Sequence, residues 1–209
     1  MTVTIHHGDN LSVMRGLPDA SFGLVYLDPP FNTGRLRERA VESASTPRDE
    51  RLPGAVTRRG FHGRDYERLR GDLRVYDDRF DDYWGFLEPR VLEAWRLLAD
   101  SGTLYLHLDY REAHYAKVLL DAVFGRDHFL NEIIWSYDYG AKTRKRWPTK
   151  HDTILVYVKD PALYWFDSEA VDREPYMAPG LVTAEKAARG KLPTDVWWHT
   201  IVPTAGREK

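Results

Sequence analysis

The residues best suited to chemistry directly follow a run of apolar residues near the N-terminus. The apolar run covers residues 22–27, and the motif after it is Asp28-Pro29-Pro30-Phe31. A continuous apolar run of strand length indicates a strand buried on both faces of a parallel sheet, and the carboxyl end of such a strand is where an α/β fold presents reactive groups. There the Asp28 carboxylate and a rigid carbonyl near Pro29 could accept the two hydrogens of an amino group. A plain turn is the alternative, since Asp and Pro are ordinary turn residues.

A second candidate is a run of cations between two expected strands. The cations are Lys142, Arg144, Lys145, Arg146 and Lys150, and the aromatic residues around them are Tyr137, Tyr139 and Trp147. No acidic residue interrupts the run. Cations interleaved with aromatic rings suit phosphate contact together with base stacking, so this basic cluster predicts a DNA-binding segment. A solvated charged turn is the alternative.

Two further groups of polar residues lie at expected ends of strands and helices. His107 and Asp109 share an edge of the expected sheet with Asp28, and we interpret them as a structural histidine and a helix cap in preference to catalytic residues. The acidic residues between positions 77 and 82 are interpreted as a solvated helix start, because aspartates stabilise helix N-termini and no ligand spacing is evident. No metal site is therefore expected.

Composition excludes several classes of protein. The chain has 209 residues and a formal net charge of −2, so any contact with nucleic acid must come from a local patch. Cysteine is absent, which excludes disulfides, thiolate metal sites and a cysteine nucleophile. No apolar run approaches the roughly 20 residues of a membrane span, and the first residues lack the pattern of a signal peptide, so we expect a cytoplasmic location.

Strands and helices are expected to alternate along most of the chain. Strands are predicted at residues 3–7, 22–28, 103–108, 131–137 and 153–158, and helices at residues 9–17, 82–98 and from a capping box of Asp109 and Glu112 to Gly125. Alternation indicates βαβ units and a mainly parallel, twisted sheet. Residues 35–74 lose this periodicity and are interpreted as a mobile loop or insertion. Residues 159–209 are irregular except for a short helix predicted at 183–189.

These segments resemble one known family in their order. The matching segments are Gly8-Asp9-Asn10, residues 28–34, residues 86–98, residues 102–109, residues 131–135 and residues 151–157. Over most of residues 3–158 they are similar to the DNA amino-methyltransferases (adenine-N6 or cytosine-N4) of the β-type motif order. The resemblance implies a Rossmann-like, S-adenosylmethionine-dependent fold in which Asp28 to Phe31 is the catalytic motif.

The resemblance also implies a role for each site residue. Asp28 and the Pro29 carbonyl would accept the hydrogens of an exocyclic amine, so that its lone pair points at the methyl group of the donor. The base must first be flipped out of the duplex, and Phe31 offers a face for stacking. Asp9, Asn10 and Asp28 would border the cofactor, although capping of a helix is an equal alternative for Asp9 and Asn10.

One part of the family pattern is missing from this sequence. The family carries a second half with a Lys-Pro motif and a glycine loop that binds S-adenosylmethionine, and no such loop is found here. We therefore expect a partial fold, in which residues 1–158 form the catalytic half and residues 159–209 an extension that could begin a target-recognition region. A C-terminal half or a second subunit would complete it. Without that half, the last available strand next to the Asp28 strand should present an unpaired edge and an apolar face.

The implied activity is site-specific methylation of double-stranded DNA, as in restriction-modification systems. Adenine N6 is the expected target, because in this family a motif that begins with Asp is mostly an adenine signature. A cytosine-N4 methyltransferase and an inactive DNA-binding remnant are the alternatives.

Overall fold

A computed structural model describes residues 2–45, 56–59, 65–138 and 142–198. The chain divides into two compact units. The first comprises Met1–Phe31 and Asp82–Lys209, and the second comprises Asn32–Asp81. Each unit is described by itself below.

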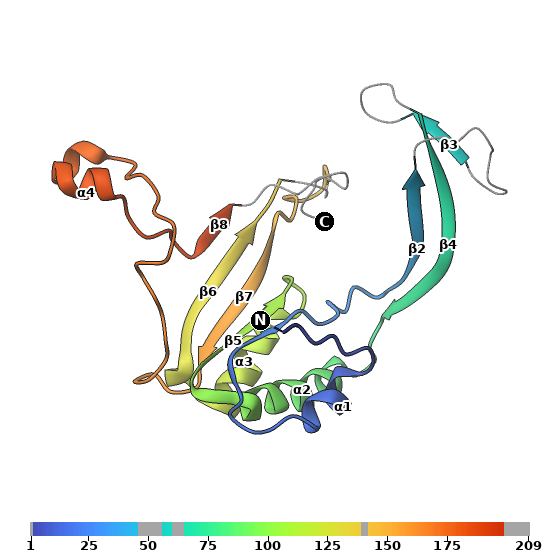
Figure 1. Ribbon diagram of the computed structural model, residues 1–209, viewed down its shortest axis with the longest axis horizontal. Coiled ribbons are helices and arrows are strands. Elements are labelled where there is room, and N and C mark those ends of the chain that lie inside the picture. Colours follow the sequence, from blue (N-terminus) through green and yellow to red (C-terminus); the bar gives the residue numbers. More distant parts are fainter. Residues whose placement is uncertain (1, 46–55, 60–64, 139–141, 199–209) are drawn as a thin grey trace. The chain divides into compact units, whose positions relative to one another are not determined.

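The first unit is built on a mixed sheet, whose described strands follow the order β1-β5-β7-β6-β8 (Figure 1). The strands are β1 (Phe22–Leu27), β5 (Leu98–Leu108), β6 (Phe129–Ser136), β7 (His151–Val158) and β8 (Val196–Trp198). β1 is parallel to β5 and β6 is parallel to β8, whereas β7 is antiparallel to both of its neighbours. The predicted α/β class is confirmed, and four of the five described strands run in one direction, while β7 alone runs the other way. β6 and β7 follow each other without the crossover helix that a parallel pair needs.

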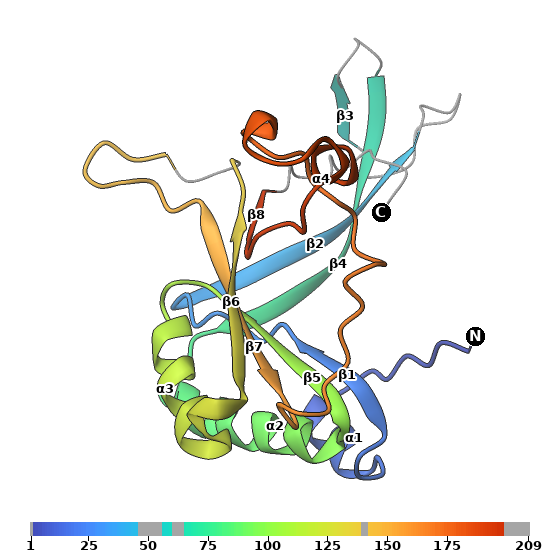
Figure 2. The same cartoon turned by 90° about the vertical axis from the view of Figure 1, so that its left-hand side faces the viewer.

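Two helices cover one face of this sheet (Figure 2). α2 (Tyr83–Leu97) packs on β5, α3 (Ala113–Phe124) packs on β7, and α1 (Asn10–Arg15) packs on α2. Alternate residues of β5 meet the helices, because side chains along a strand point to opposite faces in turn. Leu104, Leu106 and Leu108 are therefore fully buried, together with Leu87 and Val91 of α2. The predicted helix at 82–98 is confirmed, and Pro89 lies inside it.

Two expectations about local structure in this unit are wrong. Residues 3–7 form no strand, and Val3 and Ile5 are 80% and 89% exposed. Among the described strands none pairs with this segment, and a lone strand leaves its backbone groups unpaired. The capping box before α3 does not form either, because the Glu112 side chain makes no capping bond and Asp109 Oδ1 instead accepts from the Arg111 amide at 2.9 Å.

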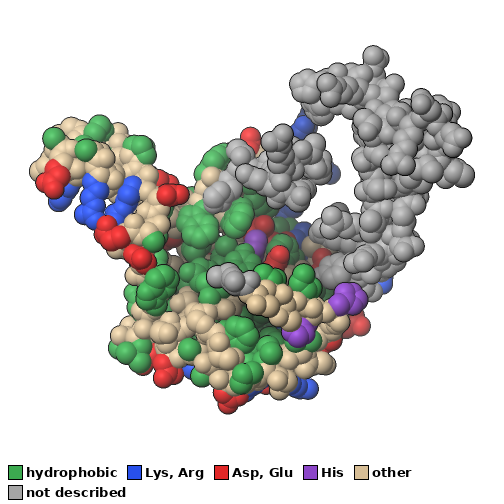
Figure 3. Space-filling view, in the orientation of Figure 1, with side chains coloured by type: hydrophobic (Ala, Val, Ile, Leu, Met, Phe, Trp, Pro, Cys, Tyr) green, Lys and Arg blue, Asp and Glu red, His purple; other side chains and the backbone are tan. Residues whose placement is uncertain are grey.

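β1 exposes both its outer edge and one of its faces. It is the edge strand of the described sheet, and Phe22, Leu24 and Tyr26 are 38%, 56% and 44% exposed. Figure 3 shows further hydrophobic side chains at the surface over the middle of the first unit, near the place of β6 and β7 in Figure 1. The prediction that the strand is buried on both faces is therefore wrong here. An unpaired edge was expected on the strand next to the Asp28 strand, but among the described strands it belongs to β1, the Asp28 strand itself, because β5 pairs with both β1 and β7.

The second unit is an antiparallel sheet in the segment predicted to be a loop. Its described strands are β2 (Arg35–Ser45), β3 (Val56–Arg59) and β4 (Asp65–Asp78), in the order β2-β4-β3. Of the two interpretations of residues 35–74, a mobile loop or an insertion, the mobile loop is wrong, because the segment contains strands. A stretch rich in charged residues carries no apolar alternation, so it gives no strand signal although its backbones pair.

The base of the second unit is held by residues that follow the catalytic motif in the sequence. Asn32 and Gly34 have φ angles of 52° and 69°, a left-handed conformation that Asn and Gly tolerate. The Thr33 amide donates to Asp78 Oδ2 at 3.1 Å, and the Gly34 amide donates to the Asp78 carbonyl at 3.0 Å. Asp78 is only 2% exposed, so interpreting it as part of a solvated acidic stretch was wrong. Asp82, in the first unit, does cap α2 by accepting from the Gly85 amide at 2.8 Å.

The chain after β7 is mostly irregular. The predicted short helix is confirmed as α4 (Ala184–Arg189), which Thr183 caps by accepting from the Lys186 amide at 3.3 Å. The irregular extension nevertheless adds β8 to the sheet through its pairing with β6. No helix within the described ranges is long and apolar enough to span a membrane.

Candidate active site

Asp28 stands at the carboxyl end of β1, where the predicted motif leaves the sheet. Its side chain is 61% exposed, and its Oδ1 lies 4.0 Å from His107 Nδ1. The Pro30 carbonyl accepts a hydrogen bond from the Tyr83 hydroxyl at 2.8 Å, so α2 holds the motif in place. Among the described residues no partner is found for the Pro29 carbonyl. An exposed carboxylate and a carbonyl on a rigid proline segment can thus both accept hydrogens from an incoming amine.

His107, on β5, is the centre of the polar groups beside Asp28. Its side chain is 13% exposed, its Nδ1 lies 2.8 Å from the Tyr26 hydroxyl, and its Nε2 lies 3.5 Å from Asp152 Oδ2. Tyr26 and His107 project from adjacent strands, and Asp152 is the second residue of β7. The sheet therefore brings residues from three strands to the same edge as Asp28.

Asp152 is a site residue that the sequence interpretation missed. It is the second residue of β7, and the beginning of a strand lies at the opposite edge of a parallel sheet from the strand ends. β7 is antiparallel to β5, with Thr153 paired to Leu108, so its beginning meets the end of β5. The absence of a helix pattern from the sequence between β6 and β7 was the signal that could have revealed this direction.

Tyr137 shows how firmly Asp152 is held. The Tyr137 hydroxyl donates to Asp152 Oδ1 at 3.2 Å. Burial first, and then the Asp152 charge, raise the pKa of Tyr137 to about 12, so its hydroxyl stays protonated and remains a donor. Asp152 is thereby held in place as a hydrogen-bond acceptor next to His107.

Asp109, by contrast, is turned away toward Arg111. Asp109 is 7% exposed and accepts from both the amide and the guanidinium of Arg111. Burial raises the pKa of the Asp109 carboxyl, and the bonds to Arg111 oppose that rise. Its contacts are those of a residue that shapes the turn before α3.

Phe31 belongs to an aromatic wall beside the catalytic motif. Its ring centroid lies 5.6 Å from that of His107, and His107 stacks on Trp135 at 5.8 Å with an interplanar angle of 16°. Trp135 in turn contacts Trp197 of β8 at 6.4 Å. Flat rings next to a hydrogen-bond acceptor make a surface on which a planar base can stack.

Asp9 and Asn10 are engaged in holding α1 to α2. Asp9 Oδ1 accepts from the Ser12 amide at 3.2 Å, which confirms the predicted helix cap, and Asp9 Oδ2 lies 2.5 Å from Arg90 Nη2. Asn10 Oδ1 accepts from Arg90 Nε at 2.9 Å. The Ser12 amide, followed by Arg90, lowers the pKa of Asp9. The Asp9 side chain remains 53% exposed, and a role next to the cofactor stays a prediction.

The basic cluster lies in the connection between β6 and β7. Lys142, Arg144, Lys145 and Arg146 are exposed, and Trp147 among them is 93% exposed. Lys150 differs, because its Nζ donates to the Asp138 carbonyl at 3.1 Å. Tyr139 lies outside the described residues. Four cations and a tryptophan therefore stand in water on one segment.

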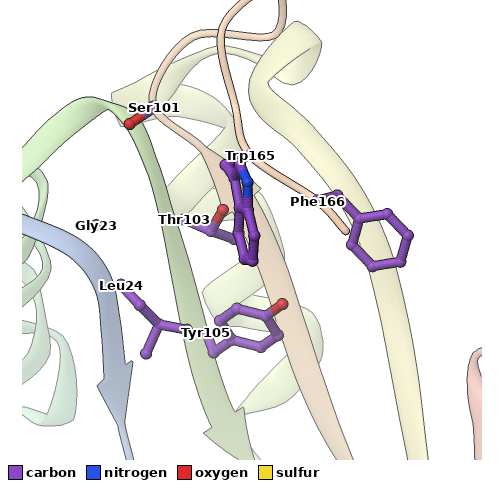
Figure 4. Close-up of a pocket in the computed structure, with 7 residues that line it drawn as sticks. All are labelled: Gly23, Leu24, Ser101, Thr103, Tyr105, Trp165 and Phe166. Carbon is purple, nitrogen blue, oxygen red and sulfur yellow. The ribbon is translucent and has the colours of Figure 1, made fainter. Parts of the chain in front are cut away.

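A hollow of about 470 Å³ lies nearer the beginning of β1, away from Asp28 (Figure 4). Its lining residues are Gly23, Leu24, Ser101, Thr103, Tyr105, Trp165 and Phe166. The Trp165 amide donates to the Ser101 carbonyl at 3.2 Å, which holds the aromatic wall of the hollow against β5. The lining has hydroxyls but no carboxylate or histidine, so acid–base chemistry belongs to the Asp28 edge instead.

The described residues at the Asp28 edge offer hydrogen-bond acceptors for an amine, whereas binding of a sulfonium cofactor requires a further structural element. A doubly wound fold binds such a cofactor where a glycine-rich turn joins a strand to a helix. No glycine with positive φ occupies a turn of that kind in the described part of the five-stranded sheet.

Comparisons with known proteins agree on one family. A family model described as DNA methylase matches residues 22–209. The type II methyltransferase M.KpnI of Klebsiella pneumoniae is 28% identical over 160 residues, which are 75% of this chain and 32% of that protein. M.ScaI of Streptomyces caespitosus is 23% identical over 205 residues, covering 93% of this chain and 55% of its own length. The DNA adenine methyltransferase YhdJ of Escherichia coli (strain K12) is 24% identical over 169 residues, covering 80% and 45%.

The chain thus spans between about a third and about half of the length of these relatives. Among solved structures, the cytosine-N4-specific PvuII DNA methyltransferase matches 96% of this chain and 58% of its own with a TM-score of 0.51. Its sequence identity is 11%, so this likeness concerns the fold alone.

Proposed function

Since the chain belongs to the DNA methylase family, we propose that it supplies the part of a DNA methyltransferase that receives the target base and activates its amino nitrogen. The observation that carries the proposal is the position of Asp28. Its exposed carboxylate ends β1 beside the aromatic wall of Phe31, His107 and Trp135. A hydrogen-bond acceptor and a stacking surface are what a flipped base with an exocyclic amine needs.

Asp28 and Pro29 act on the amine in this proposal. The lone pair of an exocyclic amine is delocalised into the base, so the nitrogen is a poor nucleophile. Hydrogen bonds from its two hydrogens to the Asp28 carboxylate and the Pro29 carbonyl favour a pyramidal nitrogen and direct the lone pair outward. The Tyr83 hydroxyl, which binds the Pro30 carbonyl, keeps the two acceptors at a fixed spacing.

The donor completes the reaction from outside this set of residues. S-adenosylmethionine, when bound, supplies an electrophilic methyl group on a sulfonium. We propose that a donor-binding half carrying the glycine loop, on the same or a second chain, lies next to Asp28. The incomplete donor site of the described residues and the exposed edge of β1 support this arrangement.

Double-stranded DNA is the proposed substrate, and adenine N6 the proposed target. The motif that begins with Asp28 and the adenine activity in the name of YhdJ support adenine. Cytosine N4 is the second candidate, because the PvuII enzyme with the same fold is named for that base. The exposed basic cluster is proposed to hold the phosphates.

The experiment that tests the proposal combines the chain with a donor-binding half, fused or in trans. Transfer of a labelled methyl group to duplex DNA is measured, and the digested nucleosides are identified by mass spectrometry. We expect N6-methyladenine from the unchanged chain and a loss of at least about 100-fold with Asp28→Ala. Asp127→Ala, on the exposed η2 turn (Arg126–His128), is the matched control and should keep its activity.

Two results would contradict this proposal. An Asp28→Ala enzyme that keeps most of its turnover would remove Asp28 from the mechanism. Nucleosides that contain only N4-methylcytosine would overturn the choice of adenine while leaving the role of Asp28 intact.

A further inference from the structure

His107 lies between two carboxylates that come from different strands. Its Nδ1 is 4.0 Å from Asp28 Oδ1, and its Nε2 is 3.5 Å from Asp152 Oδ2. We propose that His107 receives the proton that leaves the target nitrogen, and that Asp152 holds the imidazole in the form able to receive it. This inference rests on the proposed function, which places the target nitrogen at Asp28.

The contacts of the ring determine which nitrogen can accept a proton. A neutral imidazole accepts only at the nitrogen that carries no hydrogen. Nε2 is buried and faces the Asp152 carboxylate, an arrangement that favours a hydrogen on Nε2 over a lone pair there. Nδ1 lies 2.8 Å from the Tyr26 hydroxyl, which can donate to it.

The Tyr26 hydroxyl must stay protonated in order to donate to His107 Nδ1. Burial, followed by the charges of Asp28 and Asp152, raises the pKa of Tyr26, so its hydroxyl remains a donor. Both ring contacts therefore place the hydrogen of His107 on Nε2. The lone pair is then on Nδ1, where it accepts from Tyr26 and lies on the side of Asp28, so the Tyr26 hydroxyl must turn away when Nδ1 takes up the proton.

The proton transfer balances with the sulfonium methyl donor as the only co-reactant. Methyl transfer leaves a neutral thioether and a positively charged, methylated nitrogen with one hydrogen too many. Its N–H bond then breaks, the electron pair stays on the nitrogen, and the proton passes through the Asp28 carboxylate to His107 Nδ1. Asp28 is 61% exposed, so rotation about its side-chain bonds can close the gap of 4.0 Å to hydrogen-bond distance. The imidazolium formed has a carboxylate beyond each ring nitrogen.

A purely structural histidine accounts for less of what is observed. Stacking on Trp135 and contact with Phe31 need only a flat ring. A carboxylate at Nε2 and a hydroxyl at Nδ1 add nothing to stacking, yet they decide where the ring proton resides. The Tyr137 hydroxyl donates to Asp152 at 3.2 Å, so the carboxylate that faces His107 is itself held in place.

The first test is spectroscopic and needs no activity. The chain is labelled with isotopically enriched histidine, and proton–nitrogen correlation spectra report which ring nitrogen carries the hydrogen. His107→Gln identifies the signal by its loss. We expect the Nε2–H form in the unchanged chain and a shift toward the other tautomer in Asp152→Asn. An Nδ1–H form in the unchanged chain, or an unaltered His107 signal in Asp152→Asn, would overturn the proposal.

The second test uses the chain combined with a donor-binding half. We expect His107→Gln and Asp152→Asn each to lower kcat by about 100-fold, the lower range for a proton acceptor, with KM for DNA unchanged. Added imidazole should restore part of the turnover of His107→Ala, which a structural role would not predict. His128→Gln is the matched control, because His128 also contacts a tryptophan, Trp95, but lies away from Asp28.

The outcomes separate this inference from the proposed function. If Asp28→Ala abolishes turnover while His107→Gln and Asp152→Asn retain it, the proton role is wrong and the proposed function stands. If Asp28→Ala retains turnover, the proposed function itself fails. Should His107→Ala not fold, Asp152→Asn decides the question, because it keeps the size of the side chain and changes both the tautomer and kcat only if the proposal holds.

Discussion

Replacing Lys142, Arg144, Lys145 and Arg146 together by alanine tests whether the connection between β6 and β7 binds DNA. All four side chains are exposed and can reach a phosphate, and Arg146 also lies 5.9 Å from the centroid of the Tyr110 ring. Each phosphate contact contributes about 0.9 to the slope of log affinity against log salt, so four contacts contribute about 3.6. Between about 50 and about 200 mM salt, the variant should therefore lose roughly 150-fold less affinity than the unchanged chain.

The assay is fluorescence anisotropy of a labelled duplex over a series of salt concentrations. Two controls separate charge from stacking. Lys150→Gln should change the slope little, because Lys150 already donates to the Asp138 carbonyl. Trp147→Ala should weaken binding at every salt concentration without changing the slope, because Trp147 is 93% exposed and uncharged. An unchanged slope in the fourfold variant would mean that the cluster is a solvated turn.

Three further predictions follow from the contacts described. Phe31→Ala should weaken capture of a flipped base by about 1–3 kcal/mol, read from the fluorescence of a base analogue at the target position, and unaltered capture would remove Phe31 from the stacking surface. Tyr157→Phe should lower the free energy of unfolding by about 1–3 kcal/mol at neutral pH, because the buried hydroxyl donates to Asp121 at 2.7 Å. Burial, followed by the bond to Asp121, raises the pKa of Tyr157. The free energy of unfolding of the unchanged chain should therefore fall above about pH 10, and that of the variant should fall less, as measured by urea denaturation at several pH values. An equal dependence of the two free energies on pH would refute this. Calorimetry should detect no appreciable binding of S-adenosylmethionine to this chain alone, and micromolar binding would show that Asp9, Asn10 and Asp28 form a more complete pocket than expected.

The sequence allowed the catalytic motif and its place to be predicted, because a strand end followed by Asp28-Pro29-Pro30 depends only on neighbouring residues. The same is true of the helix cap at Asp9, which needs an acceptor three residues before an amide. Its second partner could not be predicted. Arg90 lies 81 positions away in the chain, and only the packing of α2 against α1 brings it within reach.

The direction of a strand was the main structural feature that the residue pattern did not predict. Apolar runs indicate that β6 and β7 exist but not which way each runs, and the placement of Asp152 beside His107 depends on that direction alone. The strands within residues 35–74 were not predicted for a different reason. Their strands pair through backbone groups, which every residue except proline supplies, so the side-chain pattern held no signal.

The exposed edge of β1 ties assembly of the sheet to catalysis. Neighbouring strands lie about 4.8 Å apart, so any strand that pairs with this edge ends one strand width from Asp28. Binding of such a strand would therefore also complete one side of the proposed active site at Asp28. In the proposed function, docking would then act as a safeguard, because no described strand pairs with the outer edge of β1 to hold a methyl donor next to Asp28.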